Sequence, residues 1–322
     1  MANEEIIPKQ LEKSVFGYAN GSSGKKGGEG VKYRLLFSVL LLHFFCLSQL
    51  LLGDNIEMTN KNTNKMSVQS WNENAFVWDQ LMDEGSFFQE QVVDPALEKM
   101  ISDIKKGTKV LEIACGNGFL SRRLARRGAD VWAFDSSANA IFLAKKRTPS
   151  DISGKIRFEV LDAAQISIYA QVGGNFDYII CNMAFMDIAD LKPVFSEAIK
   201  LLKGGGVFVI TQTHPCFEKA VGPLFQEVLE KDGTSIQTCG IKVSKYLTSS
   251  VTRVKAVPTL PNEHLFFHRS LSELFQLAFQ AGFVIDNFEE RAFPKNGSNT
   301  EHNGWHLLSE VPVIMAVRFR KV

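Results

Sequence analysis

The chain has 322 residues, of which 45% are hydrophobic and 22% are charged, a composition typical of folded globular proteins. The formal net charge of +1 provides no overall basic field that would hold the chain on nucleic acid, so we expect no nucleic-acid partner. Five widely spaced cysteines without a CxxC pair argue against a disulfide scaffold and against a cysteine zinc site.

The first 65 residues differ in composition from the rest, and we expect them to lie outside the globular domain. Residues 20–30 are rich in Gly, Ser and Lys, which predicts a disordered leader. Residues 35–52 carry no charge and approach the roughly 20 apolar residues of a membrane span. Basic residues precede them as in a signal anchor, but a buried helix or a leader from an upstream start codon fits equally well. Residues 53–65 predict a polar linker.

The globular domain is expected to span residues 66–322. Its first part, 66–108, predicts one or two aromatic-rich helices that end near Asp94-Pro95. These helices fit both a lid that excludes water from a ligand and a layer packed on a sheet. The aromatic residues concerned are Trp71, Phe76, Trp78, Phe87 and Phe88.

From Lys109 onward, short apolar runs alternate with amphipathic stretches, which predicts a mostly parallel α/β sheet with helices on both faces. Residues 109–213 form the expected cofactor-binding core, 214–269 a substrate-side insertion that breaks the rhythm, and 270–322 the end of the sheet. The expected strands are 109–114, 129–135, 155–162, 176–182, 207–213, 283–290 and 311–319, and the expected helices are 118–127, 137–146, 188–202 and 270–281. Four arginines between positions 122 and 127 are expected to face solvent.

A glycine turn directly follows the first expected strand, in the sequence Cys115-Gly116-Asn117-Gly118. Glycine lets the backbone approach a ligand that a Cβ atom would block. The helix that follows presents unpaired N–H groups at its first turn. Because ligands bind beyond the carboxyl ends of parallel strands, this turn predicts the floor of a cofactor pocket.

Acidic residues on the first three strands point to a nucleoside. Asp135 ends the second strand and is suited to accept both ribose hydroxyls, whereas Asp162 ends the third and is suited to accept from an exocyclic amine; Glu112 lies in the first. A nicotinamide dinucleotide fingerprint requires a third glycine, but position 121 is Ser. The residues therefore favour a nucleoside cofactor without a pyrophosphate.

At these motifs the chain resembles the class I S-adenosylmethionine-dependent methyltransferases. Segment 112–118 is similar to the family's glycine motif, with Ala114 in place of its commonest glycine, and Asp135 matches the acid that holds the ribose. Segments 161–163, 176–182 and 201–206 match the adenine segment, the fourth strand and the turn before the fifth strand.

The resemblance covers about residues 66–320. It implies a Rossmann-like sheet of seven strands with an antiparallel last strand, and S-adenosylmethionine as the cofactor. The implied cofactor-binding residues are Glu112, Ala114, Cys115, Gly116, Gly118, Asp135, Ser136, Asp162, Ala163, Asn182 and Met183. Segments 183–188, 213–217 and 267–272 resemble bacterial-type small-molecule methyltransferases and name no substrate.

His214 follows the fifth strand and is a candidate general base, although a loop histidine bonded to backbone fits the same position. His268 and Arg269 are suited to bind a substrate carboxylate or phosphate, or else to cap and pack the next helix. The candidate substrate-binding residues are Trp78, Phe88, Phe185, His268 and Arg269. Two histidine pairs at four-residue spacing lack a third ligand, so we expect no metal site.

The sequence thus predicts an enzyme that transfers a methyl group to oxygen, nitrogen or carbon of a small molecule by direct displacement, which mainly requires alignment of donor and acceptor. Two alternatives stay open: a non-catalytic module that binds S-adenosylmethionine, and an NAD-dependent oxidoreductase, which Ser121 disfavours. Basic residues before 35–52 would place the domain across a membrane, whereas cysteine usage and cofactor supply favour a cytoplasmic domain. We expect the latter, with or without a tether at 35–52; the sequence does not define an oligomeric state.

Overall fold

A computed structural model of the chain describes residues 61–218, 221–294 and 308–322. The predicted leader, with its apolar segment 35–52, lies outside the described residues. Among the helices that the structure describes, none has the length and apolar character needed to cross a bilayer. Residues 228–237 belong to a unit of their own, and the other described residues form one compact unit.

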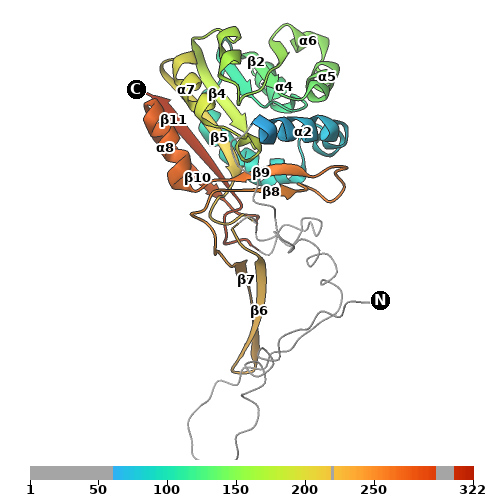
Figure 1. Cartoon of the computed structure of the whole chain (residues 1–322), viewed down its shortest axis with the longest axis vertical. Coiled ribbons are helices and arrows are strands. Elements are labelled where there is room, and N and C mark those ends of the chain that lie inside the picture. Colours follow the sequence, from blue (N-terminus) through green and yellow to red (C-terminus); the bar gives the residue numbers. More distant parts are fainter. Residues whose placement is uncertain (1–60, 219–220, 295–307) are drawn as a thin grey trace, which may run out of the picture. The chain divides into compact units, whose positions relative to one another are not determined.

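A seven-stranded sheet lies at the centre of the compact unit (Figure 1). The strand order is β10-β11-β5-β4-β1-β2-β3. Strand β11 is antiparallel to both of its neighbours, and the other neighbouring strands pair in parallel. The strands are β1 (Lys109–Ile113), β2 (Asp130–Asp135), β3 (Ile156–Val160), β4 (Phe176–Asn182), β5 (Leu202–Thr213), β10 (Phe283–Arg291) and β11 (Ile314–Lys321). The predicted seven-stranded sheet with its antiparallel last strand is therefore confirmed.

Helices cover both faces of the sheet, because side chains alternate along each strand between two apolar layers. In β1, Val110 packs in the layer formed with α3 (Asp94–Ile101), α4 (Phe119–Arg126) and α5 (Ala138–Arg147). Leu111 packs in the opposite layer, with the 3-10 helix η3 (Ile166–Gln171), α7 (Lys192–Leu201) and α8 (Leu271–Ala281). This second layer contains perpendicular phenylalanine pairs, such as Phe195 and Phe319 at a ring separation of 5.6 Å.

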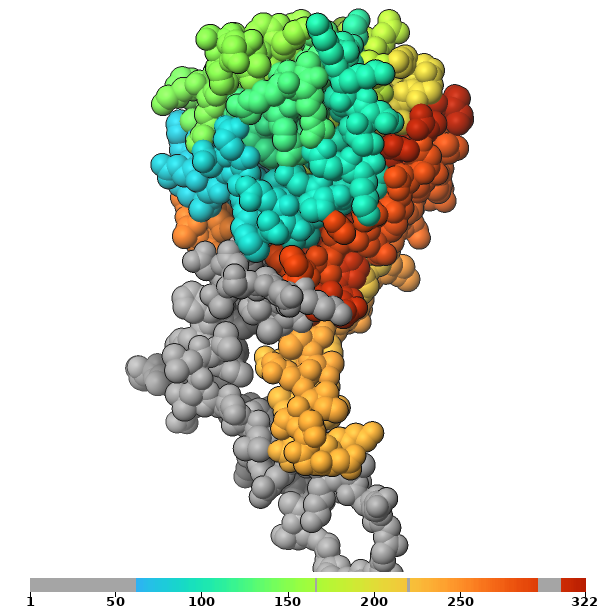
Figure 2. Space-filling view, turned by 180° about the vertical axis from the view of Figure 1, so that it is seen from behind, coloured from blue at the N-terminus to red at the C-terminus, as the bar shows by residue number. Residues whose placement is uncertain are grey.

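The N-terminal helices differ from their predicted limits. Helix α2 (Lys61–Met82) begins five residues before Met66, so part of the predicted linker is helical. A π-helical turn η2 (Gln89–Val93) follows and continues into α3. Asp94-Pro95 therefore starts a helix and does not end one, because proline in the first turn lacks only an N–H that would have no helical partner. Helix α3 lies against β10 and β11, and the teal and red surfaces adjoin in Figure 2. Lys99 of α3 pairs with Glu289 of β10.

The prediction that the four arginines at 122–127 face solvent is wrong for Arg122, whose side chain is fully buried. Its guanidinium donates to the carbonyl of Asn117 at 2.6 Å and to Glu84 Oε1 at 2.7 Å. Arg126, four residues later, is half exposed as expected. The helical period alone could not show that Glu84, in the connection between α2 and η2, is the ion-pair partner of Arg122.

The segment after β5 contains two antiparallel pairs of strands. The first joins β6 (Leu224–Lys231) to β7 (Thr234–Ile241). The second joins β8 (Ser250–Val254) to β9 (His264–His268), and β9 packs against α2 and the short 3-10 helix η4 (Phe185–Asp187). The broken strand–helix rhythm of the predicted insertion thus reflects local antiparallel pairing. Helix α6 (Ser150–Ser153) completes the described elements.

Candidate functional site

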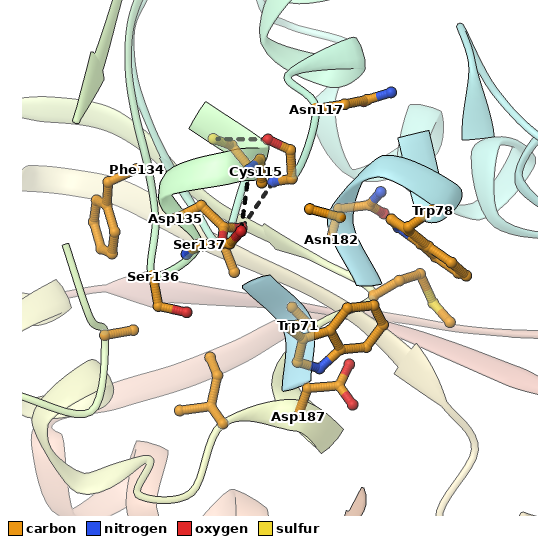
Figure 3. Close-up of a pocket in the computed structure, with 18 of the residues that line it drawn as sticks. Trp71, Trp78, Cys115, Asn117, Phe134, Asp135, Ser136, Ser137, Asn182 and Asp187 are labelled. Carbon is orange, nitrogen blue, oxygen red and sulfur yellow. Dashed lines mark hydrogen bonds between the residues drawn. The ribbon is translucent and has the colours of Figure 1, made fainter. Parts of the chain in front are cut away.

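A pocket opens at the carboxyl ends of β1, β2 and β4, and helix α2 forms one of its walls (Figure 3). Strand β1 leads into the glycine turn, β2 into Asp135, and the segment after β3 into Asp162. The strand order places β1 between β2 and β4, so the direction of winding changes at this edge. Such a switch point is where open α/β sheets bind their ligands.

The two glycines of the turn after β1 have different tasks. Gly116 has a φ of +55°, and a Cβ atom built there would meet no atom within 4 Å, so the backbone borders open space. Gly118 has a φ of +74°, and its Cβ would lie 2.8 Å from Phe158. Gly116 therefore leaves room for a ligand, whereas Gly118 allows α4 to pack closely on β3. Ala114, at a φ of +55°, shares the left-handed conformation.

Asp135 ties the end of β2 to the glycine turn. Its Oδ2 accepts the Gly116 N–H at 2.9 Å, and its Oδ1 accepts the Ser137 N–H at 2.8 Å. Burial raises the pKa of Asp135, and these two backbone hydrogen bonds oppose the shift. Each oxygen keeps a second lone pair, so the carboxylate can still accept hydrogen bonds from a ligand.

Asp162 lies in the pocket wall between α2 and the segment after β3. Its Oδ2 accepts from the side chains of Asn64 at 2.6 Å and Gln165 at 2.9 Å, and its Oδ1 accepts from the Ala164 N–H at 3.0 Å. Only Oδ1 therefore has a lone pair left without a protein donor.

Glu112, in the middle of β1, is buried beneath the glycine turn and lines the pocket. Burial raises the pKa of Glu112 to about 7, although a hydrogen bond from Ser121 and the charges of Arg123 and Arg122 oppose the shift. Ser121, which marks the departure from a dinucleotide fingerprint, therefore donates its hydroxyl to this carboxylate.

Helix α2 is fastened over the pocket by polar side chains. Asn72 accepts from the Ser137 hydroxyl and from the Asn139 N–H, both at 3.0 Å. Ser67 donates to the carbonyl of Asp187 at 2.8 Å. The indole rings of Trp71 and Trp78 meet edge to face at 5.5 Å and give the pocket an aromatic wall (Figure 3). The helix thus packs as a layer beside the pocket, and its action as a lid stays a prediction.

A cluster beneath this wall was not predicted. The carboxyl group of Asp187 points toward the indole nitrogen of Trp71 (Figure 3), and His264 Nε2 lies 3.6 Å from its Oδ1. Burial raises the pKa of Asp187 well above its usual range, and the nearby Trp71 N–H opposes the shift. Asp187 was missed because it lies in an irregular segment after β4, and its sequence neighbours give no signal.

Most of the predicted cofactor-binding residues lie together around the pocket, as does Trp78 of the predicted substrate set. Gly118 is the exception, since it lies behind the turn against Phe158. The predicted residues that line the pocket are Glu112, Ala114, Cys115, Gly116, Asp135, Ser136, Asp162, Ala163, Asn182 and Met183. Lining residues outside the predicted sets include Asn64, Ser67, Gln89, Asn117 and Ser137. Several of these residues come from α2 and η2. They were not predicted because these helices lie far in sequence from the motifs around 112–118 and 135.

The other predicted site residues lie away from this pocket. Phe185 is fully buried, with Phe195 at 5.6 Å and Phe208 at 5.8 Å, and Phe88 packs on Phe293. His214 is 2% exposed and has both ring nitrogens occupied. The Cys216 N–H donates to Nδ1 at 3.2 Å, which leaves Nε2 to donate to Glu290 at 2.8 Å.

His268 and Arg269 form a buried structural network. His268 pairs with Glu218 through Nδ1 and lies 2.8 Å from the carbonyl of Tyr246 through Nε2. Arg269 donates to the carbonyls of Ile188 at 2.9 Å and Ala189 at 2.7 Å, and burial lowers its pKa to about 10. Arg269 thus anchors the segment after η4 that carries part of the pocket wall.

The charges around the pocket fit a cationic nucleoside. Among the described residues that line it there are four carboxyl groups and no Lys, Arg or His; the acids are Glu112, Asp135, Asp162 and Asp187. A sulfonium ion would meet carboxyl oxygens here, whereas a pyrophosphate would find no cation among the described lining residues. Phe134, Leu161 and Ala163 provide an apolar wall beside Asp162. Within the described residues, no group of three or more metal-ligating side chains is found.

Comparisons with known proteins agree with this geometry. Residues 104–253 match the model of a methyltransferase domain. They form a class I S-adenosylmethionine-dependent methyltransferase domain. The cofactor of this domain is S-adenosylmethionine.

Among curated relatives of the methyltransferase domain, the chain is 34% identical over 112 residues to a magnesium-protoporphyrin O-methyltransferase of Rhodobacter capsulatus, covering 34% of this chain and 48% of the relative. It is 31% identical over 106 residues to a ubiquinone biosynthesis O-methyltransferase of Psychrobacter cryohalolentis, covering 33% and 40%. The chain thus matches less than half of the length of these relatives.

Solved structures share the fold of the methyltransferase domain. An S-adenosylmethionine-dependent methyltransferase from Mesorhizobium loti superposes with a TM-score of 0.54 at 20% identity, over 70% of this chain and 96% of that one. A magnesium protoporphyrin IX methyltransferase from Synechocystis, solved with bound S-adenosylhomocysteine, gives 0.51 at 15% identity, over 81% and 100%. At such identities the likeness concerns the fold alone.

Proposed function

We propose that this chain is an enzyme that transfers the methyl group of S-adenosylmethionine to a small-molecule acceptor. The observation that carries the proposal is a pocket lined by four carboxyl groups, without a described cation, at the carboxyl edge of a methyltransferase sheet. The names of the relatives support a small acceptor, because they act on magnesium-protoporphyrin and in ubiquinone biosynthesis.

In this proposal different residues of the pocket bind different parts of the cofactor. Asp135 accepts hydrogen bonds from the ribose hydroxyls through the lone pairs that do not bind the N–H groups of Gly116 and Ser137. Asp162 and Ala163 border the adenine, and Ala114, Cys115 and Gly116 border the amino-acid end. S-adenosylmethionine supplies an electrophilic methyl group, so the protein's task is to hold donor and acceptor in line and to exclude water.

The test has two readouts. Calorimetry of the full chain with S-adenosylhomocysteine measures cofactor binding, and mass spectrometry of a metabolite extract incubated with the chain and deuterated-methyl S-adenosylmethionine measures transfer. We expect binding, and a metabolite that gains one labelled methyl group. Binding without transfer to any metabolite would support a non-catalytic module, and binding of NAD in place of S-adenosylhomocysteine would support a reductase.

We also propose that the domain works in the cytoplasm. The support is chemical: the four cysteines among the described residues are all free thiols, as in a reducing compartment. Imaging of a fluorescent fusion of the full chain tests this, and a secreted or lumenal signal would contradict it.

A further inference from the structure

Asp187, the last residue of η4, is an acid in the pocket wall that no cofactor-binding role uses. Its side chain is 13% exposed and lines the pocket. Its Oδ1 atom is buried and has no hydrogen-bond partner. A buried polar atom without a hydrogen-bond partner destabilises the folded state. A ligand that donates a hydrogen bond to this carboxyl group would remove that cost.

Two side chains beside this carboxyl group, Trp71 and His264, are also incompletely bonded. The indole nitrogen of Trp71 and the Nδ1 atom of His264 are buried without hydrogen-bond partners, and the two rings lie 4.5 Å apart. Burial lowers the pKa of His264 to about 4, so its ring is neutral at pH 7 and does not form an ion pair with Asp187. Three neighbouring side chains from α2, η4 and β9 thus each keep one buried polar atom without a partner.

The surroundings restrict which acceptor group fits at Asp187. None of the described residues that line the pocket is a cation. The guanidinium of Arg269 donates instead to the backbone carbonyls of Ile188 and Ala189. A carboxylate or phosphate on the acceptor would therefore lie beside Asp187 without a counter-charge, which is costly in a buried site. A hydroxyl or amino group, in contrast, would supply the hydrogen bond that Oδ1 lacks. The tryptophan wall favours a flat apolar ring next to that group.

We propose that Asp187 recognises the acceptor by accepting a hydrogen bond from a hydroxyl or amino group on an aromatic ring, with His264 as a positioning residue, and that the site rejects carboxylates. This inference rests on the proposed methyltransferase function, because it assigns an acceptor to the same pocket. It names a chemical class and leaves the size of the acceptor open.

The experiment measures the binding of three probes of one shape and different head groups to the full chain saturated with S-adenosylhomocysteine. The probes are 4-ethylphenol, 4-ethylaniline and 4-ethylbenzoate, and ligand-observed NMR gives their relative affinities. We expect the phenol and the aniline to bind at least ~10-fold more tightly than the benzoate, a difference that corresponds to one charged contact. In Asp187→Asn the new amide group can donate an N–H to a carboxylate, so the benzoate should approach the other two.

The outcomes separate the two proposals. Benzoate affinity equal to or above that of the phenol, an unchanged ratio in Asp187→Asn, or no binding of any probe would overturn the acceptor site. A wild-type chain that fails to bind S-adenosylhomocysteine would instead overturn the proposed function. Thermal unfolding of Asp187→Asn, together with its affinity for S-adenosylhomocysteine, shows that the pocket is intact.

A matched pair of variants tests the role of His264. His264→Phe keeps a flat ring without nitrogen atoms, and His264→Gln keeps an N–H donor of similar reach. We expect the Phe variant to lose the preference for phenol over benzoate and the Gln variant to retain most of it. Equal ratios in the two variants would overturn the positioning role.

Discussion

The carboxylate of Asp135 accepts the backbone N–H of Gly116 at 2.9 Å, so the end of β2 holds the glycine turn that follows β1. The Ser137 N–H binds the other oxygen at 2.8 Å, and the Ser137 hydroxyl caps α5 through the Ala140 N–H. One side chain thus fixes the turn and the start of α5 before any cofactor is bound. Such preorganisation means that little order must be gained on binding.

We therefore expect Asp135→Ala to weaken the binding of S-adenosylhomocysteine by roughly 10- to 100-fold, because two backbone donors and the proposed ribose contacts lose their acceptor. Calorimetry measures the change. Asp130→Ala, at the exposed start of the same strand, is the control and should leave the affinity unaltered. An Asp135→Ala affinity equal to that of the wild type would show that the nucleoside binds elsewhere.

Gly118→Ala should lower the free energy of unfolding by about 2–4 kcal/mol, because a Cβ atom at this left-handed position would lie 2.8 Å from Phe158. Denaturant titration measures the loss. In the control Gly154→Ala, φ is −69° and no atom lies within 4 Å of the new Cβ, so a change within about 1 kcal/mol is expected. Equal effects of the two substitutions would contradict the packing role given to Gly118.

The affinity for S-adenosylmethionine should rise with pH up to about 7 and then level off. Burial raises the pKa of Glu112 to about 7, so at lower pH this residue is neutral and gives no attraction to the sulfonium ion. A bound cation stabilises the carboxylate, and binding below pH 7 should therefore release a proton. Calorimetry in two buffers of different ionisation enthalpy detects that proton. Glu112→Gln should show no release and a flatter profile, and the same profile as the wild type would assign the effect to another group.

Asp177→Asn should cost about 1 kcal/mol of stability at neutral pH and almost nothing near pH 2. Burial acts to raise the pKa of Asp177, but the Lys203 ammonium and the Lys109 N–H, which donates at 2.7 Å, outweigh it and lower the pKa below its usual value of 3.8. The stabilisation is therefore present above pH 3.8 and is lost as the pH falls through the lowered pKa. Urea titrations at several pH values measure it, and Asp151→Asn on exposed α6 should have a negligible effect throughout.

Arg269→Met should destabilise the chain by about 3 kcal/mol, because the buried carbonyls of Ile188 and Ala189 would lose their donors. Its affinity for S-adenosylhomocysteine should stay within a few-fold of the wild-type value, since Arg269 does not line the pocket. Thermal unfolding and calorimetry on the same preparation separate the two effects. A stable variant with weakened affinity would show that Arg269 contributes to binding of S-adenosylhomocysteine.

The sheet could be predicted from the sequence because each strand carries a local signal. Leu111 and Ile113 lie in a short apolar run, and the glycines after them mark the turn. The strand limits agree within a few residues, except that β5 begins at Leu202, several residues before the expected start at 207. The glycines at 204–206, which predict a break, instead lie within β5, where its register against β4 shifts between Phe176 and Tyr178.

The pocket could be predicted only as far as it is built from residues at the ends of strands. Asp135 and Asp162 follow strands, so their meeting at one edge follows from the topology. Asn64 and Asp187 meet the same pocket from α2 and η4, through contacts that no periodic pattern encodes. For His214 the position after β5 was predicted, but the side chain's bond to Glu290 depends on the register of β10 and β11.

Helix α2 crosses the pocket while Asn64, Ser67 and Asn72 bind groups on three other segments of the chain. A spent nucleoside must leave the proposed site before a fresh one enters, and we expect this exchange to break several of these bonds together. We therefore expect departure of the product, and not the chemical step, to limit the turnover rate. The amide protons of α2 would then exchange with solvent at a pace that matches the catalytic cycle.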